Sequence, residues 1–169
     1  MRRHRLIIIA GLASTLLSAA PACAATGGIA TVNASVVKPL VLTWLQDLDL
    51  GTIVLGPGSW SGATVGVSQA GALSCTNTNV TCSGATKPTQ YNVSGSNRQV
   101  VHITAPNVTL VNQGDATQTL TLVISAPPSV TLTNSGPPGS DFSIGGSITL
   151  NSTTAGGTYV GTMNVTVDY

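Results

Sequence analysis

The sequence predicts an all-β protein built around one β-sandwich domain. Short runs rich in Thr and Val are separated by Gly, Pro and Asn, which is typical of strands joined by turns. Beyond the first 24 residues, no apolar pattern keeps a helical period, and glutamate is absent from the whole chain. Turn signals recur about every eight to twelve residues, the spacing expected of a sandwich or barrel.

Residues 1–24 have the composition of a secretory signal peptide. Three arginines lie within the first five positions, an apolar run follows from Leu6 to Leu17, and small residues surround the expected cleavage after Ala24. The run is too short to span a bilayer, so no transmembrane segment is expected after signal removal. We therefore expect a secreted protein of the periplasm, cell surface or medium of a Gram-negative-type bacterium.

The rest of the chain carries little charge. Three of the six Lys and Arg residues lie in the leader, which leaves three basic residues against five aspartates and a net charge of −2. A surface with so few positive charges has no electrostatic footprint for nucleic acid or anionic membranes. Its Thr, Ser, Asn and Gly are typical of extracellular β proteins, and no nucleic-acid partner is expected.

Cys75 and Cys82 are the two cysteines that remain once Cys23 leaves with the leader. In an oxidising compartment this pair predicts a disulfide that pins a loop and carries no chemistry. A metal site would need two more soft ligands, and only His102 is left, so no metal or cofactor is expected. A lipoprotein signal at Cys23 is disfavoured by Ala20, where such signals carry leucine.

The strands are expected in the following order. The first run spans 28–37, and Lys38-Pro39 ends it because proline cannot donate to a ladder. Further runs are expected at 40–44, 48–55, 60–68, 72–75, 91–94, 100–105, 108–111, 119–125, 130–133 and 142–150. Turn residues at 95–98 predict a hairpin, and those at 112–115 predict a second turn between neighbouring strands.

The last run, residues 158–169, alternates to the final residue. Its odd-numbered positions carry the apolar residues Tyr159, Met163, Val165, Val167 and Tyr169. Thr, Asn and Asp dominate the even-numbered positions. This predicts a half-buried strand whose outer edge, without Pro or Lys, is open to a partner strand. The partner is residues 28–37 of the same chain, which gives a closed monomer, or of another chain, which gives a filament.

Two stretches resemble a known family: "DLDLGTIVLG" (47–56) and "FSIGGSITLNSTTAGGTYVGTMNVTVDY" (142–169). They resemble the start and end of a family of secreted bacterial domains of unknown function, which is similar to the spore-coat-protein-U-like subunits of chaperone–usher pili. The resemblance implies an immunoglobulin-like, pilin-like sandwich of residues 38–169 that lacks a strand beside its C-terminal strand. The N-terminal arm, residues 25–37, of another subunit would fill the gap.

The resemblance also implies site residues and partners. By position, the acceptor groove would be lined by Tyr159, Met163, Val165 and Val167. The donor side chains would be Ala30, Val32, Ala34 and Val36. The implied function is that of a surface-assembly subunit that polymerises by β-strand donation. Its partners would be copies of itself or chaperone–usher-type assembly proteins.

Other readings are weaker. Ser68 lies in a near match to a nucleophile elbow, but no helix is expected after it, and no catalysis is expected. Asp47 and Asp49 share a face without the looped ligand array that calcium needs. Trp44 and Trp60 favour packing over a sugar-stacking platform. The main alternative is a self-complete domain that binds polysaccharide or matrix, and an outer-membrane β-barrel is disfavoured by few aromatics and short runs.

Overall fold

A computed structural model describes residues 27–169, and the expected signal peptide, residues 1–24, lies outside them. Contacts divide the chain into a unit that ends at Ser35 and a second unit, Val36–Tyr169. The described part contains strands and no helix, as predicted. Accordingly, none of its segments is a helix long and apolar enough to cross a membrane.

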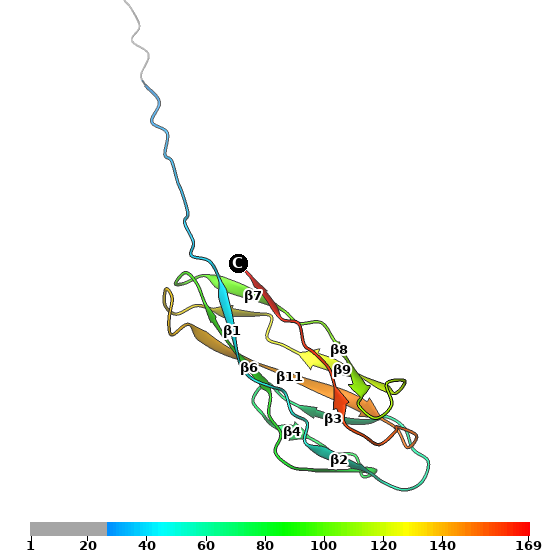
Figure 1. Ribbon diagram of the computed structural model, residues 1–169. Coiled ribbons are helices and arrows are strands. Elements are labelled where there is room, and N and C mark those ends of the chain that lie inside the picture. The colour runs from blue at the N-terminus through cyan, green and yellow to red at the C-terminus, as the bar shows by residue number, and fades with distance from the viewer. Residues whose placement is uncertain (1–26) are drawn as a thin grey trace, which may run out of the picture. The chain divides into compact units, whose positions relative to one another are not determined.

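The second unit contains thirteen strands. They are β1 (Val41–Gln46), β2 (Thr52–Leu55), β3 (Ala63–Val67), β4 (Leu73–Ser74), β5 (Val80–Ser83), β6 (Thr89–Ser94), β7 (Val100–Thr104), β8 (Val108–Asn112), β9 (Thr119–Ser125), β10 (Ser129–Thr131), β11 (Ser140–Leu150), β12 (Tyr159–Val160) and β13 (Thr166–Asp168). Figure 1 labels several of them, among them β1, β6, β7 and β11. All pairings are antiparallel, and the largest sheet has the order β1-β6-β11-β9-β8-β12. β3 also pairs with β11, and β4 pairs with β3.

One hydrophobic cluster lies between β1-β6-β11 and a second sheet of order β10-β7-β13. Tyr91 and Val93 enter it from β6, and Val101 and Ile103 enter it from β7. Tyr91 also stacks on Phe142 of β11, with ring centroids 5.6 Å apart. Side chains from both sheets therefore share one interior, which is the arrangement of a β-sandwich.

A second cluster fills the other end of the domain. Val65 of β3, Leu122 of β9 and Ile148 of β11 are buried in it, and Ile53 and Leu55 of the two-stranded sheet β2-β5 pack against it. The strand β11 serves both clusters because it is eleven residues long and exchanges β6 for β3 and β9 as neighbours (Figure 1). Phe142, Ile144, Ile148 and Leu150 point inward along it, so its alternation matches its sequence pattern.

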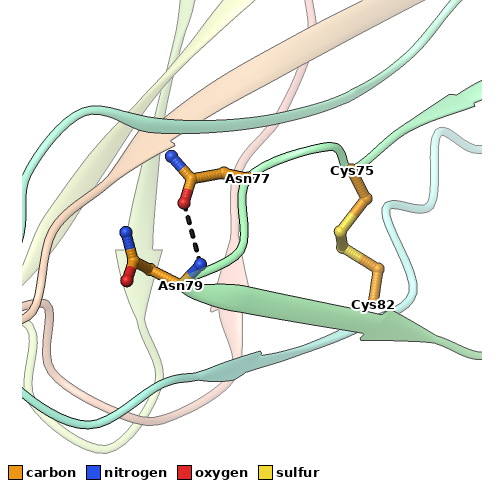
Figure 2. The surroundings of a disulfide bond; sticks show 4 residues. All are labelled: Cys75, Asn77, Asn79 and Cys82. Atoms are coloured by element: carbon orange, nitrogen blue, oxygen red, sulfur yellow. Dashed lines mark hydrogen bonds between the residues drawn. A yellow bond between two sulfur atoms is a disulfide. The ribbon is translucent and has the colours of Figure 1, made fainter.

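The disulfide predicted between Cys75 and Cys82 is present (Figure 2). It joins the residue after β4, at the edge of the large sheet, to β5 of the two-stranded sheet. Within the loop it closes, the amide of Asn79 donates to Oδ1 of Asn77 at 2.9 Å. The bridge thus ties two sheet edges that share no ladder hydrogen bonds.

Two expectations about local structure were wrong. The segments 91–94 and 100–105 do form strands, β6 and β7, but not a hairpin, because β6 pairs with β1 and β11 whereas β7 pairs with β10 and β13. The intervening turn therefore crosses between the layers. The run 28–37 forms no strand, and neither does any other residue from 27 to 40.

Candidate strand-acceptor site

The C-terminal segment passes from one sheet to the other. Tyr159 and Val160 pair with β8 of the large sheet, and residues 166–168 pair with β7 of the three-stranded sheet. Residues 161–165 belong to no strand, so the single continuous strand expected from the alternation is interrupted. Gly161 fits closely against β8, since a Cβ there would lie 2.7 Å from the carbonyl oxygen of Thr109.

The alternation of this segment is nevertheless confirmed. Met163, Val165, Val167 and Tyr169 are half-buried and pack against the cluster between the two sheets. The intervening Thr162, Asn164, Thr166 and Asp168 are exposed. The segment therefore presents one apolar face to the interior, and that face is incompletely covered.

The outer edge of β13 carries unpaired backbone groups. The N–H of Ile103 in β7 donates to the carbonyl oxygen of Pro128 at 3.0 Å, on the β10 side. Backbone groups of alternate residues point to opposite edges of a strand, so His102 and Thr104 are the residues that face β13. Val167 is paired with Ile103, and its N–H and C=O consequently point away from β7, to an edge where no described strand lies.

The first strand also has a free edge. Of the strands in residues 27–169, β1 pairs with β6 alone, and Leu40 and Leu42 are half-buried against the same cluster as Val165 and Val167. Trp44 lies on β1 opposite Tyr91 but remains 56% exposed. No ladder connects β1 to β13 among the described residues. Two open edges thus border one shared apolar interior.

A group of hydrogen bonds joins these two edges at one end. The hydroxyl of Tyr169 accepts from the N–H of Ser96 at 2.9 Å and donates to the carbonyl oxygen of Lys38 at 2.6 Å. The N–H of Lys38 donates to the hydroxyl of Ser96 at 2.6 Å. Gly95 makes room for this arrangement, because a Cβ there would collide with the Tyr169 hydroxyl. We call Tyr169, Ser96 and Lys38 the latch.

The structure brings only some of the sequence-derived site residues together. Met163, Val165 and Val167 meet at the interior cluster, whereas Tyr159 lies on β12 and donates its hydroxyl to the carbonyl oxygen of Ala155 at 2.8 Å. Leu40, Leu42 and the latch were not predicted from the sequence as part of the site. The alternation of apolar residues could have placed Tyr169 in the site, but no local sequence pattern distinguishes Ser96 or Lys38.

The four donor candidates lie outside every strand. Ala30, Val32, Ala34 and Val36 are all exposed, Val32 at 90% and Val36 at 92%.

The other candidate groups do not converge. His102 is exposed on β7 between the buried Val101 and Ile103, and Asp47 and Asp49 are both exposed. Trp60 packs against the second cluster and donates its Nε1 to the carbonyl oxygen of Gly56 at 3.1 Å. Within residues 27–169, no three His, Cys, Asp or Glu residues are grouped as metal ligands would be.

Comparison with known proteins gives one match. The family model described as "Domain of unknown function (DUF4402)" matches residues 40–169, which include all thirteen strands. No curated protein and no solved structure matches the chain.

Proposed function

Because the chain belongs to the DUF4402 family of domains of unknown function, we propose its function from the acceptor site itself. The protein is a surface-assembly subunit with an immunoglobulin-like, pilin-like sandwich, exported by its N-terminal signal. A strand from residues 28–37 adds to the open edge of β13, and repeated addition builds a filament. Its partners are further copies of the chain, delivered by chaperone–usher-type proteins, and no catalysis is part of this proposal.

The observation that carries the proposal is the pairing of β13. Val167 of β13 and Val165, two residues before it, are half-buried against the apolar cluster, and the Val167 N–H and C=O face an edge where no described strand lies. A strand added there gains ladder hydrogen bonds and covers apolar surface in the same step. Ala30, Val32, Ala34 and Val36 have the two-residue period that such a strand needs.

The disulfide supports the same proposal by tying a different pair of edges. Cys75 and Cys82 link β4 to β5 at the other end of the domain. Exposed strand edges invite uncontrolled association unless they are blocked. A covalent tie at this seam leaves the edges of β1 and β13 unblocked, as strand addition there requires.

One surface depression favours a second function, the binding of a saccharide. A depression of about 520 Å³ is lined by Gln69, Gln90, Ser129, Asp141 and Ser143, with Phe142 and Val130 as apolar lining. Amides, hydroxyls and a carboxylate around an apolar wall suit the hydroxyls and C–H faces of a neutral sugar. This function would make the protein a binding domain, and it does not require assembly.

Deletion of residues 25–37 tests the assembly function. The exported full chain is expected to give oligomer ladders that survive detergent without heating, and the deleted chain is expected to give none. A full-length protein that stays a monodisperse monomer, and is unchanged by the deletion, would refute assembly. In that case, binding of neutral oligosaccharides to the monomer, lost in the Gln90→Ala variant, would support the second function.

A further inference from the structure

We propose that the latch formed by Tyr169, Ser96 and Lys38 keeps the arm out of its own acceptor site, so that the occupant is the arm of a second copy. This inference rests on the proposed function and decides between the closed monomer and the filament. The arm begins immediately before Lys38, whose N–H and C=O are both held, by Ser96 and Tyr169 respectively. A change of direction at Lys38 would break both hydrogen bonds.

The sequence Lys38-Pro39 also disfavours a reversal of the chain. For the run 28–37 to lie beside its own β1, the chain must reverse at Lys38-Pro39. The favoured two-residue loops of antiparallel strands need a positive φ at their first residue, which would be Lys38. A residue before proline is instead pushed toward extended conformations. Arg98 is the one described non-glycine residue with a positive φ, so Lys38 does not adopt the turn conformation.

A reversal of the chain at an earlier residue would not place the whole donor run in its own acceptor site either. Val36 and Val37 come next along the arm, and β-branched residues are poorly suited to positive φ. A turn at Asn33-Ala34, which suits a turn better, removes Ala34 and Val36 from the donor strand. Half of the apolar donor side chains would then be lost. The full donor run therefore reaches an acceptor edge only on another molecule.

The test is to build the missing turn. The variant K38N/P39G/Y169F places Asn-Gly, the favoured hairpin loop, before β1 and removes the latch hydroxyl. We expect at least a tenfold loss of oligomers by size-exclusion chromatography, and a monomer whose residues 28–37 become protected from amide hydrogen exchange. The control variant G156A leaves the latch and Lys38-Pro39 unchanged and adds a Cβ that meets nothing within 4 Å, and we expect its oligomer yield to stay within twofold of the wild type.

The possible outcomes separate this inference from the proposed function. If the triple variant assembles as well as the wild type, the latch has no such role, although strand addition stands. A monomeric wild type with residues 28–37 protected from exchange would mean that the arm fills its own site, which overturns the inference and, with it, assembly into a filament. A monomeric wild type with both residues 28–37 and β13 unprotected would overturn the proposed function and this inference together.

Discussion

The Tyr169 hydroxyl lies 2.6 Å from the carbonyl oxygen of Lys38, and so connects the end of β13 to the start of β1. These two strands share no ladder hydrogen bonds, although their apolar residues pack against one cluster. The contact therefore joins two segments whose neighbouring strands, β1 and β13, each have an edge that pairs with no other described strand. This relationship between Tyr169 and Lys38 underlies the predictions about assembly.

Removal of the Tyr169 hydroxyl should weaken this connection. The Y169F variant loses two hydrogen bonds, to Ser96 and to Lys38, and we expect its free energy of unfolding to fall by about 1–2 kcal/mol. Urea unfolding measures the loss, and hydrogen exchange at the Ser96 amide should accelerate. The matched control is Y159F, which loses a hydroxyl bonded to Ala155 instead. If both variants accelerate exchange at Ser96 equally, the contact is not specific to Tyr169.

A charge on the apolar face of the C-terminal segment should abolish assembly. In V165D a carboxylate replaces a half-buried side chain that packs against the interior cluster, and we expect a destabilisation of more than about 2 kcal/mol or loss of folding. The control T166D places the same charge on the exposed face of β13, where we expect a change within about 0.5 kcal/mol. Normal yield and assembly of V165D would show that the wrong face has been assigned.

A side chain at position 95 should displace the Tyr169 hydroxyl of the latch. A Cβ there would lie 2.8 Å from Leu40 Cδ2 and 3.0 Å from Leu132 Cδ1, and would collide with the Tyr169 hydroxyl. We expect G95A to lower the midpoint of thermal unfolding, at a cost of about 1–3 kcal/mol. At Gly156 a Cβ meets nothing within 4 Å, so G156A should be neutral or slightly stabilising. Equal midpoints for the two variants would argue against close packing around Gly95.

Loss of the disulfide should destabilise the domain moderately. The cysteines are seven residues apart in the chain, and closing so short a loop contributes about 2.5 kcal/mol by chain entropy. The C75S/C82S variant should therefore unfold at lower urea concentration by that free energy. Dithiothreitol should produce the same shift in the wild type and none in the variant. A variant as stable as the oxidised protein would mean that the bridge does not constrain the unfolded chain.

The turn between β8 and β9 contains one carboxyl group with a shifted pKa. The hydroxyl of Thr117 donates to Asp115 Oδ1 at 2.7 Å and its N–H donates at 3.0 Å, and both bonds hold the pKa of Asp115 below its usual value. A lowered pKa in the folded state adds stability at neutral pH that is lost as the pH falls through that pKa. The T117V variant loses the hydroxyl that donates to Asp115 and keeps the N–H of residue 117, so an NMR titration should show a higher pKa of Asp115. An unchanged pKa would contradict a role for the hydroxyl.

Strand identities could be predicted from the sequence because the local alternation survives folding. The 142–150 run corresponds to β11, and every second residue from Met163 to Tyr169 is half-buried as expected. The sequence could not show that β6 and β7 join different sheets, because a turn such as 95–98 has the same composition in a hairpin and in a crossover. Nor could it reveal the latch, whose members lie 58 to 131 residues apart in the chain.

The most direct test is amide hydrogen exchange at Val167 in the exported full chain and in the chain that lacks residues 25–37. Strand addition predicts strong protection of the Val167 amide in the full-length oligomer and rapid exchange after the deletion, because no described strand covers that edge. The Thr104 amide, which faces β13, should be protected in both and serves as the reference. Equal exchange at Val167 in the two proteins would contradict the account.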